Sequence, residues 1–122
     1  MKVLCLCGGG VFRSKYLAEY LENMGYHTSY AGVDISCVKN PASQTMVDRA
    51  DVVILVHPWI KNALGDRKEN GMTGKGYVDL EGKKIITLNV RDAFPEEGRP
   101  FEDVYSELEQ QIGPYFATLL KL

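Results

Sequence analysis

Short apolar runs alternate with amphipathic segments along the chain. Between and after the runs, apolar residues recur at steps of three and four, the spacing of one helix face. Two such stripes predict helices, one from Arg13 to a stop at Gly25 and one from Phe101 to Leu119. Gly113-Pro114 should split the second helix, because proline lacks a backbone N–H. The runs themselves predict four strands: Lys2–Leu6, His27–Ala31, Val52–Val56 and Lys84–Val90.

Two shorter helices are expected between these elements. Ser43 can cap one that runs to about Ala50, and Pro58 suits the first turn of another that runs to Leu64. Trp59 is expected to pack at the start of that second helix, with the lining of a ligand pocket as the less favoured alternative. The remaining segments are predicted to be loops: Val33–Pro41, Gly65–Gly76 and Arg91–Pro100.

Strands that alternate with helices predict an α/β fold, a doubly wound parallel sheet with right-handed crossovers and helices on both faces. Residues 1–122 are expected to form a single domain, since the chain shows no repeat, low-complexity tract or linker. In such a sheet a ligand binds beyond the carboxyl ends of the strands. Two predicted loops lie there, Cys7–Arg13 after the first strand and Arg91–Pro100 after the last.

The composition is that of an ordinary globular domain, with 45% hydrophobic and 25% charged residues. The formal net charge of -2 shows no basic excess, so we expect neither nucleic-acid nor membrane binding. The longest apolar stretch, Val52–Val56, is far too short to span a bilayer, and the first residues lack a signal-peptide pattern. Three cysteines without framework spacing suggest a reducing compartment. We therefore expect a cytoplasmic protein, and we expect it to be a monomer.

The most informative segment is a glycine-rich turn between a predicted strand and a predicted helix. Glycines let the backbone curl so that its N–H groups converge on an anion at a helix N-terminus. The dinucleotide fingerprint needs a third glycine where Arg13 stands, and the nucleotide P-loop needs Gly-Lys-Ser/Thr in place of Phe12-Arg13-Ser14, so neither fits. We expect this turn to bind phosphate through Gly8, Gly9, Gly10, Val11, Phe12 and Arg13.

Three side chains of the same turn suggest covalent chemistry on a phosphoryl group. The helix dipole, the loop amides and Arg13 all favour the thiolate form of Cys7, which is then a nucleophile. The guanidinium of Arg13 can bind two phosphate oxygens at once. Ser14 can donate a hydrogen bond to the sulfur and help it leave from a phosphocysteine. A core thiol or a surface guanidinium alone would more often be structural, but the combination at this spacing favours catalysis.

A phosphatase also needs an acid that protonates the leaving oxygen. Asp92 is the best candidate, because it directly follows the strand Lys84–Val90 and so lies at the same sheet edge as Cys7. Phe94, two residues later, is expected to form a wall of the substrate pocket. The structural alternative is that Asp92 only shapes a turn.

These residues resemble the low-molecular-weight protein tyrosine phosphatase family, in particular its shortened prokaryotic members. The stretch from Val3 to Arg13-Ser14 is similar to the family's opening strand and phosphate loop. The segment Ala50–Val56 resembles its third strand, and Leu88–Phe94 resembles its aspartate loop. The resemblance covers nearly the whole chain and is weakest over Gly65–Gly82.

The resemblance implies strand order 2-1-3-4 and catalysis without a metal or other cofactor. It makes Cys7 the nucleophile, Arg13 the phosphate-binding arginine, Ser14 the thiolate-stabilising serine and Asp92 the general acid. The implied activity is hydrolysis of phosphomonoesters, above all protein phosphotyrosine, through a phosphocysteine intermediate. The partner is then a phosphorylated protein or a small phosphomonoester.

Three other functions stay open. Gly10 and Ala93 replace an asparagine and a proline that are frequent in the family, so a non-catalytic phosphate or phosphopeptide binder is an alternative. Arsenate reductases of related folds use a similar loop, so arsenate reduction is a second alternative. That reaction needs resolving thiols, and only Cys5 and Cys37 are present for this role. A phosphocarrier also holds a phosphocysteine after its first strand, but Arg13 together with Asp92 favours hydrolysis.

The remaining chemistry-bearing residues are interpreted as structural. Cys5 is expected to be a small buried hydrophobe. His27 and His57 have no ligand spacing with other candidates, so no metal site is predicted. The acidic residues of the last helix are expected to form a solvated face: Glu102, Asp103, Glu107 and Glu109.

Overall fold

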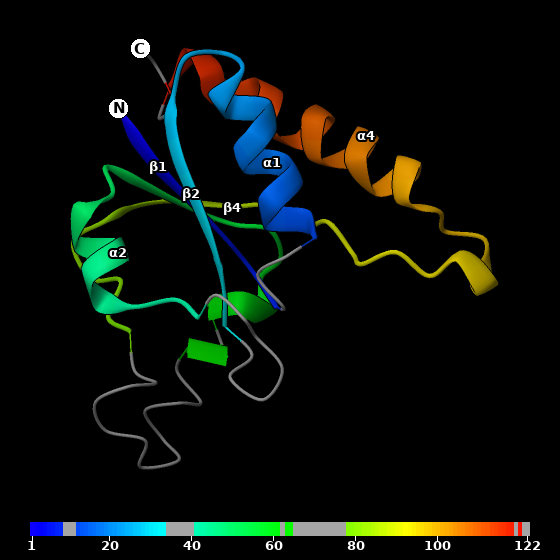
Figure 1. Ribbon diagram of the computed structural model, residues 1–122, viewed down its shortest axis with the longest axis horizontal. Helices are drawn as coiled ribbons and strands as arrows, with labels where there is room; N and C mark the ends of the chain where they lie inside the picture. Colours follow the sequence, from blue (N-terminus) through cyan, green and yellow to red (C-terminus); the bar gives the residue numbers. More distant parts are fainter. Residues whose placement is uncertain (9–11, 34–40, 62, 65–77, 119, 121–122) are drawn as a thin grey trace.

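The fold is seen in a computed structural model of the chain (Figure 1). The structure describes residues 1–8, 12–33, 41–61, 63–64, 78–118 and 120. The predicted loops Val33–Pro41 and Gly65–Gly76 therefore lie largely or wholly outside the described residues.

A four-stranded sheet forms the centre, and its strands follow the order β2-β1-β3-β4 with every pair parallel. This confirms both the α/β class and the strand order 2-1-3-4 that the resemblance implied. β1 is central, and its Cys5 lies beside Tyr30 of β2 and Ile54 of β3. The strands are β1 (Lys2–Cys7), β2 (His27–Gly32), β3 (Val52–Leu55) and β4 (Lys84–Thr87).

Helices cover both faces of this sheet. Figure 1 shows α1 and α4 together on one side and α2 on the other, and α1 and α4 are in contact. A further helical segment begins at Trp59, after β3. The helices are α1 (Arg13–Glu22), α2 (Gln44–Arg49) and α4 (Phe101–Ile112), with 3-10 turns η1 (Pro95–Glu97) and η2 (Gly113–Ala117).

Local sequence signals explain most helix ends. The Ser43 hydroxyl accepts a hydrogen bond from the Met46 amide at 3.3 Å and so caps α2, as predicted. Gly25, at φ 104°, follows α1, and α4 changes into η2 at Gly113-Pro114, where the split was expected. α1 ends at Glu22, slightly before the predicted stop at Gly25.

The fourth strand is shorter than predicted, because its regular ladder with β3 ends at Thr87. The chain nevertheless stays beside its neighbour: the Leu88 amide donates to the Leu55 carbonyl at 2.8 Å, and the Val90 amide donates to the Val56 carbonyl at 2.9 Å. This irregular extension carries the backbone straight to Asp92 at the carboxyl edge of the sheet.

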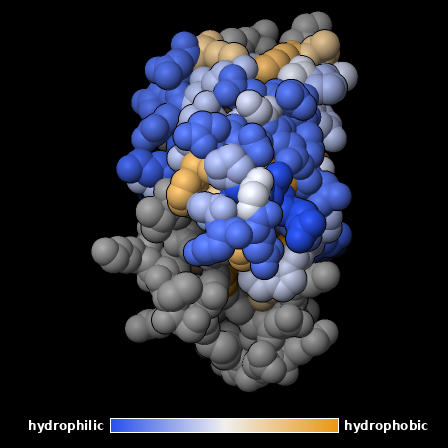
Figure 2. Space-filling model, turned by 90° about the vertical axis from the view of Figure 1, so that its right-hand side faces the viewer, coloured by the Kyte–Doolittle hydropathy of each residue, from blue (hydrophilic) through white to orange (hydrophobic). Residues whose placement is uncertain are grey.

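The core lies on both faces of β1 and β3, whose residues from Val3 to Cys7 and from Val52 to Leu55 are all buried. α1 and α4 contribute Leu17, Leu21 and Leu108 to this core. The view from the side of α4 shows a mostly hydrophilic surface with small apolar patches (Figure 2). Among the described helices, none has the length and apolar character needed to cross a membrane.

Candidate active site

Cys7 is the last residue of β1, at the carboxyl edge of the sheet. Its sulfur lies 3.0 Å from the Ser14 hydroxyl oxygen, within hydrogen-bond distance, and both residues are buried. The Val33 amide donates to the Cys7 carbonyl at 2.9 Å and to the Gly8 carbonyl at 3.1 Å. The residue that follows β2 therefore fixes the carboxyl end of β1. The structure thus brings together the predicted nucleophile and the predicted thiolate-stabilising serine.

Arg13 and Ser14 form the first turn of α1, so Cys7 faces a helix N-terminus. Phe12, at the N-cap position, makes no side-chain cap, and no acidic residue stands in the first turn. The positive end of the helix dipole is therefore not neutralised within its own first turn, and it favours an anion at the sulfur.

The Arg13 side chain is only 9% exposed, and its Nη1 donates to the Val90 carbonyl at 2.7 Å. This bond joins the first turn of α1 to the segment that follows β4. The guanidinium carries five N–H groups, and this bond engages one of them. Arg13 is thus oriented by a contact from outside its own helix.

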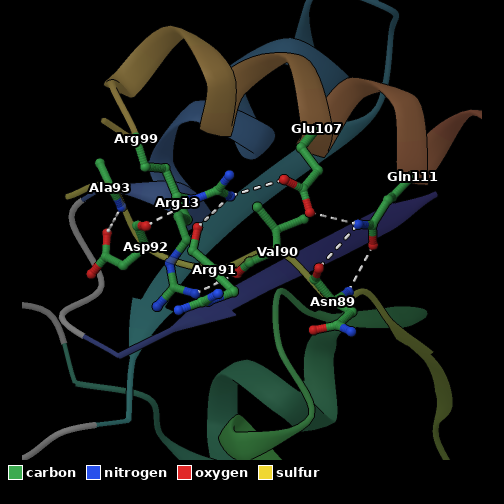
Figure 3. A network of polar contacts seen from close by, with 9 residues as sticks. All are labelled: Arg13, Asn89, Val90, Arg91, Asp92, Ala93, Arg99, Glu107 and Gln111. Carbon is green, nitrogen blue, oxygen red and sulfur yellow. Dashed lines mark hydrogen bonds and ion pairs between the residues drawn. The ribbon is translucent and has the colours of Figure 1, made fainter. Parts of the chain in front are cut away.

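Asp92 lies two residues beyond Val90 and is exposed. Its Oδ1 accepts a hydrogen bond from the Ala93 amide at 2.9 Å, so one carboxylate oxygen is turned toward its own loop. In Figure 3, Asp92 lies on the Arg13 side of a polar network, opposite Gln111. Asp92 therefore follows closely on the segment whose Val90 carbonyl Arg13 contacts, and its role as an acid remains a prediction. Phe94 follows with 44% of its side chain exposed.

The Phe12 side chain packs on α4 and so does not take part in binding phosphate. Its ring packs edge-on against Phe101, with centroids 4.6 Å apart, and lies 5.4 Å from the ring of Tyr105 on α4. Only the backbone of Phe12 is then left to bind an anion. Gly8 is described, whereas the predicted phosphate-binding residues Gly9, Gly10 and Val11 lie outside the described residues.

Trp59 is a neighbour of the site that the sequence reasoning had assigned to packing at a helix start. Its ring carbon Cζ3 lies 3.7 Å from the position that a Cβ on Gly8 would take, yet 46% of the residue is exposed. An exposed indole therefore lies next to Gly8, the residue that directly follows the predicted nucleophile Cys7. Its place just after β3, at the ligand-binding edge, was the available signal.

Cys5 is fully buried in β1, as expected of a small apolar residue. Burial raises the pKa of its thiol far above the ordinary value, and the neighbouring Cys7 raises this pKa further. Cys5 therefore stays protonated and unreactive. Cys37 lies outside the described residues. Within the described ranges, no three His, Cys, Asp or Glu side chains are grouped so as to hold a metal ion.

Comparison with known proteins gives matches at the level of structure. No protein-family profile matches the chain, and no curated protein sequence does. A low molecular weight protein tyrosine phosphatase from T. tengcongensis superposes with a TM-score of 0.62 at 18% identity, covering 100% of this chain and 99% of that one. The YwlE arginine phosphatase from Geobacillus stearothermophilus gives 0.62 at 20% identity, covering 98% and 92%.

A thioredoxin-dependent arsenate reductase from Corynebacterium glutamicum gives a TM-score of 0.63 at 12% identity, covering 98% of this chain and 61% of that one. The chain therefore has the fold of the low molecular weight protein tyrosine phosphatases, as its sequence indicated. Because this fold carries at least three differently named activities, the chemistry has to be argued from the site.

Proposed function

We propose that this protein is a cysteine-dependent phosphatase that hydrolyses phosphomonoesters through a phosphocysteine intermediate. The observation that carries the proposal is the contact of 3.0 Å between the Cys7 sulfur and the Ser14 hydroxyl at the N-terminus of α1, with the buried Arg13 beside them. A nucleophilic thiolate needs such surroundings: a hydrogen-bond donor, a helix dipole and a fixed positive charge.

In the first step the Cys7 thiolate attacks phosphorus, a sulfur–phosphorus bond forms and the ester phosphorus–oxygen bond breaks. Arg13 and the loop amides bind the non-bridging oxygens and stabilise their charge in the transition state. Asp92 gives its proton to the leaving oxygen, so that an alcohol or phenol departs rather than its anion.

In the second step a water molecule attacks the phosphocysteine. Asp92, now ionised, takes a proton from this water, and the sulfur–phosphorus bond breaks to release inorganic phosphate. The Ser14 hydroxyl donates its hydrogen bond to the departing thiolate and lowers the cost of expelling it. The two steps together return every residue to its starting protonation state.

The exposed aromatic residues favour an aromatic ester, with phosphotyrosine as the preferred substrate. Among the described residues, the large hydrophobic side chains that remain exposed are Met24, Trp59, Phe94 and Phe101. The Trp59 ring lies 3.7 Å from the position that a Cβ on Gly8 would take, Phe94 lies two residues after Asp92, and the ring of Phe101 packs on that of Phe12. Flat aromatic leaving groups gain both apolar burial and ring stacking against such side chains.

Hydrolysis of p-nitrophenyl phosphate by the wild type and two variants tests the proposal. Cys7→Ser should abolish turnover, by about 10⁴-fold or more, while still binding phosphate, because a serine hydroxyl is not ionised by this site. Asp92→Asn should lower turnover by about 10²-fold or more, and most for poor leaving groups.

Cys5→Ala is the matched control, because it removes a thiol from the same strand without touching the site, and it should retain turnover. Full turnover by Cys7→Ser would remove the nucleophile assignment. Phosphate binding without any wild-type turnover would instead support a non-catalytic binder.

Arsenate reduction is the weaker candidate, although one structure with this fold carries that activity. It needs a second reactive thiol, and burial leaves Cys5 protonated. Arsenate reduction by the wild type that is lost in a Cys37→Ser variant would favour it over the phosphatase.

A further inference from the structure

The segment from Asn89 to Asp92 is attached to α4 by a polar network (Figure 3). At its beginning, the Gln111 side chain bonds both backbone groups of Asn89. The Asn89 amide donates to Gln111 Oε1 at 2.7 Å, and Gln111 Nε2 donates to the Asn89 carbonyl at 3.0 Å. The glutamine amide thus pairs with the backbone as a neighbouring strand would, at a point where the regular ladder has already ended.

At the other end of the segment, Arg99 binds two successive carbonyls. Its Nε donates to the Asp92 carbonyl at 3.0 Å, and its Nη2 donates to the Arg91 carbonyl at 2.9 Å. The guanidinium is planar and rigid, so two bonds from one edge fix both the position and the direction of this backbone.

Glu107 connects the two ends of the network. Its Oε2 accepts from Arg99 Nη2 at 2.9 Å, and its Oε1 accepts from Gln111 Nε2 at 3.1 Å. Glu107 and Gln111 are one helical turn apart on α4, so they face the same side. The Arg99 and Glu107 side chains are 24% and 31% exposed, which leaves the ion pair less screened than a fully exposed pair.

A tight turn returns Arg99 to this position. The amide and carbonyl of Phe94 pair with the carbonyl and amide of Arg99, at 2.8 Å and 3.0 Å. Pro95 starts η1, and Gly98 ends it at φ 83°, a conformation that favours glycine. The side chain of Arg99 therefore reaches back across the turn to Asp92, two residues before the turn begins.

We infer that Arg99 is a positioning residue for Asp92, an inference that rests on the proposed phosphatase function. Arg99 holds the Asp92 backbone against α4, and so sets where its carboxyl group meets the leaving oxygen. The same segment contains Val90, whose carbonyl orients Arg13, so α4 fixes the acid and the phosphate-binding arginine relative to each other. Small misplacement of a catalytic group is costly, about 10²-fold in rate for about 1 Å.

A double-mutant cycle tests whether Arg99 acts through Asp92. The substrates are phenyl phosphate, which has a poor leaving group, and p-nitrophenyl phosphate, which has a good one. Arg99→Ala should lower kcat/KM, which reports the first step, by about 10- to 100-fold for phenyl phosphate and by distinctly less for p-nitrophenyl phosphate, because proton donation matters most for poor leaving groups. In an Asp92→Asn background the same substitution should change kcat/KM by less than about twofold, because coupled residues are not additive.

Arg49→Ala, on the exposed surface of α2, is the matched control and should leave both rates unchanged. An equal loss from Arg99→Ala with and without Asp92 would overturn the inference, and so would unchanged leaving-group dependence in an active enzyme. An inactive wild type is a different result, since it would defeat the proposed function first and the inference with it.

Glu107→Gln provides a second variant in case Arg99→Ala fails to fold. It keeps a hydrogen-bonding side chain of the same size but removes the charge that holds Arg99. We expect the same selective loss on phenyl phosphate, smaller in size, with far-UV circular dichroism unchanged. A folded Glu107→Gln protein that loses both substrates equally would contradict the positioning role.

Discussion

At the scale of single residues, the chemistry depends on which side chains meet at the end of β1. Cys7 and Ser14 are seven positions apart, and the end of β1 and the first turn of α1 bring them into contact. Trp59, in the helical segment after β3, lies close to Gly8, because its ring carbon Cζ3 is 3.7 Å from the position that a Cβ on Gly8 would take. An exposed indole next to the nucleophile suggests a contact with the organic part of the substrate.

Trp59 is the single tryptophan of the chain, so its fluorescence reports directly on this site. Benzylphosphonate should change its emission, and inorganic phosphate should change it less, because only the former carries a ring that stacks on the indole. By titration calorimetry, Trp59→Ala should weaken benzylphosphonate binding roughly 2- to 10-fold, the range expected from loss of one aromatic pair.

Phosphate binding by the Trp59→Ala variant should remain within about twofold of the wild type, since phosphate has no group to stack. Met24→Ala, which removes another exposed apolar side chain beyond the end of α1, serves as the control. Equal weakening of both ligands would show that Trp59 supports the loop rather than the substrate.

At the scale of elements, the contact between α1 and α4 supports the site. The rings of Tyr16 and Tyr105 stack with centroids 3.9 Å apart, and the Tyr16 hydroxyl donates to Glu109 at 2.8 Å. Phe12, which begins α1, packs on the same helix. Two of the acidic residues expected on a solvated face, Glu107 and Glu109, are instead half-buried and bonded, and that expectation was wrong for them.

The Tyr16–Glu109 contact should make stability depend on pH in the alkaline range. Its hydrogen bond to Glu109 raises the pKa of Tyr16 to about 12. Because this folded-state pKa lies above the ordinary value of about 10, the stabilisation is complete below pH 10 and is lost as the pH rises through about 12. At pH 7, Tyr16→Phe should lower the free energy of unfolding by about 1 kcal/mol.

Urea unfolding at several pH values between 7 and 11 measures this difference. It should shrink toward the alkaline end, because above about pH 10 the phenol ionises in the unfolded state while the folded state still holds its proton. Tyr20→Phe, on the same helix, should show a difference that does not vary in this way. A constant difference for Tyr16→Phe would mean that the hydroxyl contributes no linked stability.

At the scale of the whole molecule, a buried sheet connects all these parts. β3 is buried along its whole length and lies between β1, which carries the proposed nucleophile, and β4, which leads to the proposed acid. The Tyr26 hydroxyl donates to the Leu120 carbonyl, which ties the chain's last described residue back to the start of β2. We expect one cooperative unit, in agreement with the single domain proposed for residues 1–122.

Ile54→Ala tests this cooperativity, because Ile54 is fully buried in the central part of β3. Loss of its side chain should cost about 2–5 kcal/mol, and the urea transitions followed by circular dichroism and by Trp59 fluorescence should shift together. Separate transitions for the two signals would contradict a single unit.

The sequence by itself determined the elements and the reactive turn, because both depend on short-range patterns. Apolar periodicity and the signals at Ser43, Gly25 and Pro114 were sufficient for the order of strands and helices. The proximity of Cys7 and Ser14 could be predicted in the same way, because both residues belong to one short segment between a strand and a helix.

Only the tertiary structure decided which distant residues support that turn. Arg13 bonds to a carbonyl 77 positions away, Gln111 pairs with Asn89, and Glu107 holds Arg99. No sequence pattern predicts these contacts. A polar side chain on a helix recurs at the same spacing whether it faces solvent or bonds to another segment. Their roles follow from how α4 packs against the end of the sheet, which is a property of the assembled fold.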